Sequence, residues 1–111
     1  IIMQKAQTTL GPVQIGILLL ALATAAIHII LAIPANLTMF YLNGLGYIAL
    51  ALALILPQFK NYRGLIRWVL IAFTLATIIG WVAIGERNTI AYIDKIIEVA
   101  LLVLLWLDRG R

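Results

Sequence analysis

Four apolar runs, each long enough to cross a membrane as a helix, are the feature of this sequence that most restricts its fold. They cover residues 13–33, 37–56, 65–84 and 90–107. A hydrocarbon core about 30 Å thick requires roughly 20 apolar residues in a helix. Proline suits the ends of helices, and Pro12, Pro34 and Pro57 lie at the ends of these runs. The runs therefore predict an all-α fold of four transmembrane helices in a single domain, residues 1–111.

The segments between the runs are short, and helices joined by short loops pack as antiparallel neighbours. We therefore expect an up-down-up-down bundle. Composition agrees, since 65% of the 111 residues are hydrophobic and 11% are charged, against about 25% charged in soluble domains. The absence of cysteine excludes disulfides and thiolate metal sites. The net charge of +4 includes no basic patch with interleaved aromatic residues, so nucleic acid is not an expected partner.

The distribution of lysine and arginine predicts the orientation in the membrane. With four spans, one side of the membrane holds both termini and the middle loop, with the cations Lys5, Lys60, Arg63, Arg67, Arg109 and Arg111. The other side holds Arg87 and at most Lys95. Cytoplasmic loops carry the excess of basic residues, so both termini are predicted to be cytoplasmic. We expect a multi-pass protein of the cytoplasmic membrane of a prokaryote, in contact with membrane lipids.

Small residues recur at four-residue spacing in three of the runs. They are Ala72, Ala76 and Gly80 in the third run, Ala21 and Ala25 in the first, and Ala49 and Ala53 in the second. Such rows let helix backbones approach closely. We expect packing within the bundle, with docking onto another membrane subunit as the alternative. Gly44 and Gly46 in the second run are assigned the same packing role.

Four polar residues lie at membrane depth: His28, Asn43, Asp94 and Glu98. At 1.5 Å per residue, all four fall within roughly 7 to 14 Å of the same helix ends, so they are predicted to form one polar intramembrane cluster. Asp94 and Glu98 are four residues apart and share a helix face, whereas Lys95 is turned about 100° away and is expected to reach the outer headgroups.

The chemistry of this cluster leaves several alternatives open. Two carboxylates in a low dielectric repel each other, and a protonated His28 would relieve that repulsion. One interpretation is a buried polar clasp that fixes helix register. A second is a proton relay, ion site or ligand site, and a third is contact with a partner subunit. A lone histidine also raises the hypothesis of a ligand to haem or to a chlorophyll-type pigment.

Three segments carry a resemblance to a known group of proteins: "TAAIHIILA", "YLNGLGYIALALALIL" and "YIDKIIEVALLVLL". The chain resembles small four-helix membrane proteins of unknown function from archaea, notably haloarchaea, and some bacteria. The residues that match this pattern are His28, Gly44, Gly46, Trp81, Asp94 and Lys95. The acidic loops of the haloarchaeal type are missing here. The resemblance implies the four-helix fold and no activity.

The function expected from the sequence is that of a non-catalytic accessory subunit of a larger membrane complex, respiratory or photosynthetic. A chain with almost no extramembrane surface has little room to do chemistry there. The alternative is a small homo-oligomeric transporter, channel or proton-conducting protein that uses His28, Asn43, Asp94 and Glu98. An enzyme is not expected, because no nucleophile or metal motif accompanies the carboxylates and no metal site is predicted.

Overall fold

The computed structural model describes residues 11–108, and all of its regular structure is helical. The elements are α2 (Pro12–Ala35), α3 (Thr38–Ile55), the 3-10 helix η1 (Pro57–Tyr62), α4 (Arg63–Ile84) and α5 (Thr89–Leu107). The all-α prediction with four helices is confirmed, with boundaries within two residues of those expected. Lys5, Arg109 and Arg111 lie outside the described residues.

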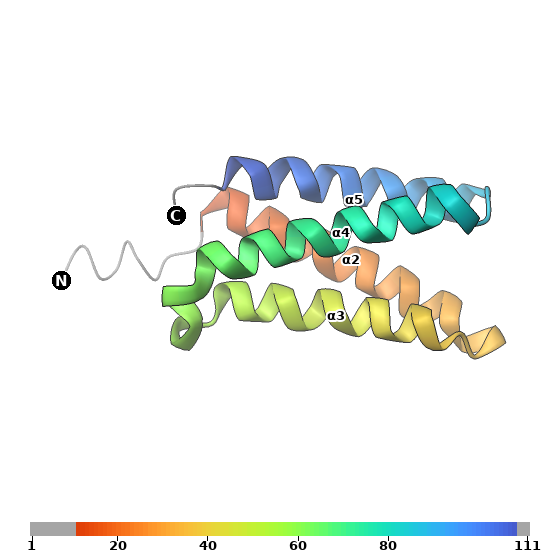
Figure 1. Ribbon diagram of the computed structural model, residues 1–111, viewed down its shortest axis with the longest axis horizontal. Helices are drawn as coiled ribbons and strands as arrows, with labels where there is room; N and C mark the ends of the chain where they lie inside the picture. Colours follow the sequence, from red (N-terminus) through yellow and green to blue (C-terminus); the bar gives the residue numbers. More distant parts are fainter. Residues whose placement is uncertain (1–10, 109–111) are drawn as a thin grey trace.

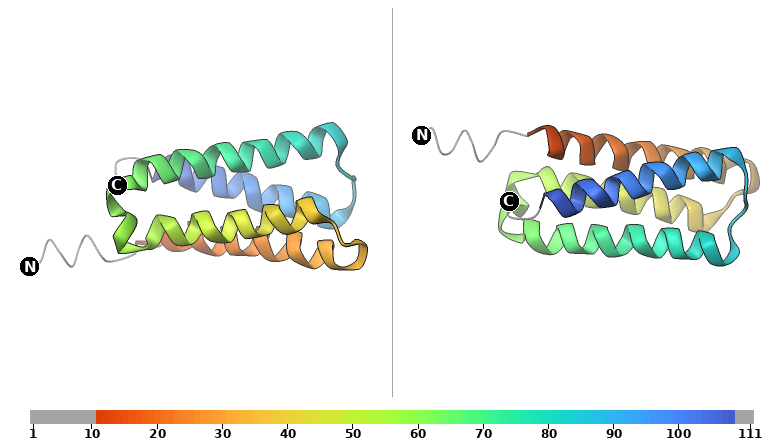
Figure 2. Two further views of the ribbon diagram at one scale, coloured as in Figure 1. Left: turned by 60° about the horizontal axis from the view of Figure 1, so that its bottom comes forward. Right: turned by 90° about the horizontal axis from the view of Figure 1, so that it is seen from above.

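Each helix runs antiparallel to the one before it (Figure 1), and the contacts between neighbouring helices close the four into a ring. In this ring α2 packs against α3 and α5, and α4 packs against the other sides of α3 and α5. Figure 2 shows the same arrangement from two more directions. One end of the bundle, here called the basic end, carries Lys60, Arg63 and Arg67 near the η1 turn. The opposite end holds the loops at 36–37 and 85–88.

Two local features differ from the expected ones. Pro34 was predicted to close the first helix, but α2 continues through it to Ala35. The helix ends at Asn36, which adopts a left-handed conformation (φ 51°), and the N–H of Leu37 then donates to the carbonyl of Ala32 (3.0 Å). Proline is tolerated in this last turn because little helix remains for it to disrupt. The turn η1 was not predicted.

The outside of the bundle is apolar. Exposed large apolar side chains outnumber the buried ones among the described residues, the reverse of what a water-soluble bundle of this size would show. Three helical segments are long and apolar enough to cross a membrane: Pro12–Ala35, Thr38–Ile55 and Pro57–Ile84. These are the properties of a membrane protein. The remaining helix, α5, has three charged residues, Asp94, Lys95 and Glu98.

The interior is divided along its length. Toward the basic end, the buried side chains are apolar, with Ile17, Leu54, Leu70, Leu101 and Leu105 in the core. Toward the opposite end, the buried side chains of α2 and α5 are mostly polar or charged. Burial of a polar group without a partner is costly, so the contacts of these side chains decide what this part of the bundle can do.

Candidate functional site

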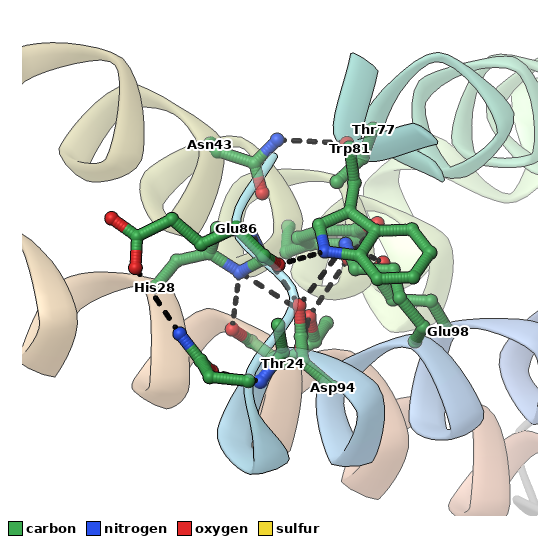
Figure 3. Close-up of polar contacts among 12 residues, drawn as sticks. Thr24, His28, Asn43, Thr77, Trp81, Glu86, Asp94 and Glu98 are labelled. Atoms are coloured by element: carbon green, nitrogen blue, oxygen red, sulfur yellow. Dashed lines mark hydrogen bonds and ion pairs between the residues drawn. The ribbon is translucent and has the colours of Figure 1, made fainter. Parts of the chain in front are cut away.

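Six buried side chains from three helices form what we call the polar cluster. They are Thr24 and His28 on α2, Tyr47 on α3, and Asp94, Lys95 and Glu98 on α5. Each of these residues, taken whole, is at most 9% exposed. Figure 3 shows Thr24, Asp94 and Glu98 side by side, with His28 one helical turn from Thr24. The cluster begins about 8 Å into α5, since Asp94 is five residues after Thr89.

Thr24 connects α2 to both carboxylates. Its Oγ1 lies 2.5 Å from Asp94 Oδ1 and 3.0 Å from Glu98 Oε2. A threonine hydroxyl has one hydrogen and can donate to only one of these oxygens. If both carboxylates were ionised, the second contact would bring together two oxygens with no hydrogen between them. The geometry therefore favours one more proton on the pair formed by Asp94 and Glu98.

Tyr47 reaches Glu98 across the diagonal of the ring. Its hydroxyl donates to Glu98 Oε2 (3.0 Å), and its ring packs edge-on against Phe73 (centroid distance 4.8 Å). Because Tyr47 supplies a hydrogen to Oε2, Thr24 can donate to Asp94 instead. Glu98 and Tyr47 are both fully buried, so water does not compete for these bonds.

Lys95 lies inside the bundle, which contradicts the expectation that it reaches the headgroups. Its Nζ is 2.5 Å from Glu98 Oε1 and 3.2 Å from Asp94 Oδ2, and its side chain is 11% exposed. The physical reason is charge compensation. Two buried carboxylates without a cation are far less stable than the same pair with an ammonium group, and the flexible lysine side chain can turn inward to supply one.

The orientation of His28 follows from its hydrogen bonds. Its Nδ1 lies 2.8 Å from the carbonyl of Thr24, which can only accept, so Nδ1 carries a hydrogen. In the neutral ring Nε2 is then the basic nitrogen, and it lies 3.7 Å from Asp94 Oδ2. This distance is too long for a hydrogen bond. A proton gained by Nε2 would turn the contact into an ion pair.

The charges of the polar cluster do not balance without an added proton. Asp94 and Glu98 contribute two negative charges, Lys95 contributes one positive charge, and neutral His28 contributes none. A buried net charge of −1 is unfavourable in a low dielectric. A single proton, on a carboxyl or on His28, neutralises the cluster. Of these positions, only Asp94 Oδ1 or Glu98 Oε2 also supplies a hydrogen to the contacts of Thr24.

Asn43 does not join the cluster, although the sequence prediction placed it there. Its Nδ2 donates to Thr77 Oγ1 on α4 (2.8 Å), and Thr77 in turn donates to the carbonyl of Phe73 (2.9 Å). In Figure 3 this pair lies apart from the carboxylates. Asn43 Oδ1 is buried without a hydrogen-bond partner. The role of Asn43 in the described structure is to join α3 to α4.

A stacked pair covers the approach to the cluster from the 85–88 loop. The guanidinium of Arg87 lies 4.1 Å from the centroid of the Trp81 ring, and Lys95 Nζ lies 5.9 Å from the same ring. The indole N–H of Trp81 donates to the carbonyl of Glu86 (2.7 Å). Trp81 thus links the loop to the cation of the cluster.

The cluster contains a set of donors that could hold a metal ion, although no metal site was predicted. Ligand atoms of His28, Asp94 and Glu98 lie within 4.8 Å of one another. Lys95 Nζ, however, lies against both carboxylates, where its charge opposes that of a cation. The set therefore suits a metal only if Lys95 moves away.

The hypothesis that His28 ligates a haem or pigment does not fit this geometry. Its Nε2 faces Asp94 inside the bundle, and its ring packs against Phe40 and Tyr47 at centroid distances of 5.4 and 6.2 Å. A tetrapyrrole needs an open face in front of the ligating nitrogen, and the side chain of His28 is only 8% exposed.

The predicted packing residues divide into two groups. A Cβ atom added to Gly44 would lie 2.9 Å from the carbonyl oxygen of Ala25, and one added to Gly46 would lie 2.5 Å from the Phe73 ring. Both glycines therefore permit close contacts. Packing within the bundle is wrong for Ala72, Ala76 and Gly80, because all three are exposed and Gly80 has no neighbour within 4 Å of an added Cβ. The inward face of α4 contains Leu70 and Thr74 instead.

Sequence reasoning missed Thr24, Tyr47 and the inward position of Lys95. Thr24 lies one helical turn before His28 and shares its face, which was an available signal. Comparison with known proteins finds no family model, no curated protein and no solved structure that matches the chain. The resemblance to small four-helix membrane proteins therefore stays a prediction, and the polar cluster is the feature that points to a function.

Proposed function

We propose that this protein is a small integral membrane protein that binds and releases one proton at the polar cluster, in the class of transporters and proton-conducting proteins. The observation that carries the proposal is the pair of contacts at Thr24, where one hydroxyl hydrogen faces both Asp94 Oδ1 and Glu98 Oε2. The net charge of the six side chains is likewise balanced by one added proton. Ionisable side chains inside a membrane bundle are associated with proton and ion pathways.

The direction in which the carboxylates face favours this class over an accessory subunit. Asp94 and Glu98 point to α2 and α3, not to the outside of the bundle, so they are not available to a foreign chain. Asp94 Oδ2, the oxygen that does not contact Thr24, lies 3.7 Å from Nε2 of His28, so a proton on this oxygen of the carboxyl group would face the imidazole. A small shift of either side chain would bring them within hydrogen-bond distance.

Access to the cluster is proposed from the end that holds the 85–88 loop. The apolar layer around Leu70, Leu101 and Leu105 separates the cluster from the basic end. Proton binding therefore takes place from one side, and transfer to the other side requires that this layer open, in the bundle or in a homo-oligomer.

We further propose that α5 is a fourth span, so that the chain crosses the membrane four times. Its three charges face the interior and compensate one another, while its exposed large side chains are apolar or aromatic, among them Ile96, Val99 and Val103. Under the positive-inside rule the basic end is cytoplasmic. The resemblance to archaeal and bacterial proteins supports a prokaryotic cytoplasmic membrane.

Infrared difference spectroscopy of the purified protein in liposomes, stepped between acidic and alkaline pH, tests proton binding directly. We expect a carboxylic acid C=O band that is present at acidic pH and lost at alkaline pH. Asp94→Asn or Glu98→Gln should remove or shift this band. Glu86→Gln is the matched control, since Glu86 is an exposed carboxylate of the neighbouring loop. A spectrum with no band altered by either cluster variant would refute the proposal.

The same liposomes test transport. With an enclosed pH-sensitive dye and an imposed membrane potential, the wild-type protein should carry a proton flux above that of protein-free vesicles. Asp94→Asn should abolish the flux and Glu86→Gln should not. Proton binding without flux would leave the cluster as a proton-binding site and exclude conduction by this chain alone.

A second candidate function is that of a non-catalytic accessory subunit of a respiratory or photosynthetic complex. The observation that favours it is the row formed by Ala72, Ala76 and Gly80, which is exposed on α4. Such rows let another helix approach closely. Extraction in a mild detergent followed by sizing and absorption spectroscopy distinguishes the candidates. A large coloured particle with other polypeptides supports the accessory role, and a colourless particle of this chain alone supports the transporter class.

A further inference from the structure

An apolar groove runs along the outside of the bundle between α4 and α5. It is lined by Ile71 of α4 and by Leu102, Val103, Trp106 and Leu107 of α5, and it has a volume of about 330 Å³. All five lining side chains are apolar or aromatic, so the groove suits an apolar chain.

A buried arginine lies at the end of this groove. Arg67 is one helical turn before Ile71 and only 7% exposed. Its Nε donates to the carbonyl of Leu105 (2.7 Å), and its Nη2 lies 3.5 Å from the carbonyl of Trp106, a groove residue. Its guanidinium lies 5.0 Å from the centroid of the Trp68 ring. An arginine has five N–H donors, so these two bonds leave donors for an anion.

The surroundings of Arg67 are basic. Lys60 and Arg63 lie on η1 and at the start of α4, near the same end of the bundle. The acidic group at this end is Asp108, which accepts from Gln14 of α2. Trp68 and Trp106 pack edge-on at 6.2 Å, in the position where aromatic side chains meet lipid headgroups. Positive charge, tryptophan and an apolar groove thus meet at one place.

We propose that this place binds one anionic phospholipid, with an acyl chain in the groove and the phosphate against Arg67. Basic pockets between transmembrane helices are suited to anionic headgroups, and arginine matches the geometry of a phosphate group better than lysine does. The site is independent of the polar cluster, which lies beyond the apolar layer toward the other end of the bundle.

Native mass spectrometry of the detergent-purified chain tests the proposal. The probes are dioleoylphosphatidylglycerol and dioleoylphosphatidylcholine, which share acyl chains and differ in headgroup charge. We expect one phosphatidylglycerol to bind in preference to phosphatidylcholine. Arg67→Gln should reduce this preference about fivefold, which corresponds to the loss of one basic contact.

Two matched controls separate binding from damage to the fold. Arg87→Gln removes the arginine that donates to the last carbonyls of α4, at Trp81 and Val82, just as Arg67 donates to those of α5. It should not alter the lipid preference. Val103→Trp fills the groove and should displace both lipids, whereas Val99→Trp, on a similarly exposed position one turn away, should not.

If Arg67→Gln does not fold, the pair of valine variants still decides the matter. Equal binding of the two lipids by the wild-type chain would overturn the headgroup assignment. Unchanged lipid binding by the Val103→Trp variant would refute the assignment of the acyl chain to the groove. Retention of phosphatidylglycerol in Val99→Trp together with its loss in Val103→Trp is the result that supports the site.

Discussion

Replacement of Thr24 by valine tests the central contact of the polar cluster. Valine has nearly the shape of threonine and lacks the hydroxyl, so the change removes the group that contacts both Asp94 and Glu98 and creates no large cavity. Thr24 is completely buried, so water does not readily replace the lost donor.

The expected loss of stability in Thr24→Val follows from the number of hydrogen-bond donors that the substitution removes. One hydroxyl hydrogen is lost, whatever the number of contacts, and a bond to a charged group contributes about 1.5 to 3 kcal/mol in soluble proteins. Hydrogen bonds between membrane helices average about 0.6 kcal/mol and reach about 1.7. Because Lys95 and Tyr47 still serve the two carboxyl groups, we expect Thr24→Val to lower the free energy of unfolding by about 1.5 kcal/mol. This is about a tenfold change in the unfolding equilibrium.

Equilibrium unfolding in mixed micelles, followed by tryptophan fluorescence and circular dichroism, is the assay. Thr74→Val is the comparison variant, because Thr74 is equally buried but donates to Leu70 of its own helix (2.8 Å) and contacts the Tyr47 hydroxyl, not the carboxylates. A back-bond of this kind contributes little to helix stability, so the control should change stability by less than about 0.5 kcal/mol. Equal effects of the two substitutions would refute the bridging role of Thr24.

Three further predictions use the same unfolding assay. Gly44→Ala should destabilise the bundle by about 1 to 3 kcal/mol, because its Cβ would meet the Ala25 carbonyl, whereas Gly80→Ala should be neutral or slightly stabilising. His28→Ala and Asp94→Asn should be non-additive, with a coupling of about 0.6 to 2 kcal/mol; simple additivity would show that the two side chains do not interact. Lys95→Met should leave carboxylates that bind Zn²⁺ or Mn²⁺, seen as a rise in Tm that the wild-type protein lacks; no rise in Tm for this variant would contradict the donor geometry.

The helices could be predicted because their signals are local. Apolar runs and prolines mark the segments, and the observed boundaries lie within two residues of the expected ones. The faces of the helices could not be predicted with the same success. The row of Ala72, Ala76 and Gly80 has the spacing of an interface, but spacing does not state which side of α4 meets the other helices. The side of α4 that faces inward depends on which side chains of α3 and α5 it packs against.

The cluster shows the same limit at the level of single side chains. Depth along a helix placed His28, Asp94 and Glu98 together, because rise per residue is fixed. Depth also placed Asn43 with them, but Asn43 bonds to Thr77 on a different pair of helices. The angle around the helix pointed Lys95 outward, yet its flexible chain turns inward to the carboxylates. Backbone geometry was therefore informative for His28, Asp94 and Glu98 and misleading for Asn43 and Lys95.

The position of Lys95 changes what the carboxylates require. Without it, Asp94 and Glu98 would need two positive charges or protons, and with it they need one. A site that lacks a single proton can be neutral in one state and singly charged in the other, which is the smallest change that proton exchange can produce. In the proposed function, His28 Nε2 receives that proton after a small movement, and the leucines toward the basic end are the barrier to its further transfer. The proposal therefore makes passage through the membrane depend on movement of the apolar layer as well as of the cluster.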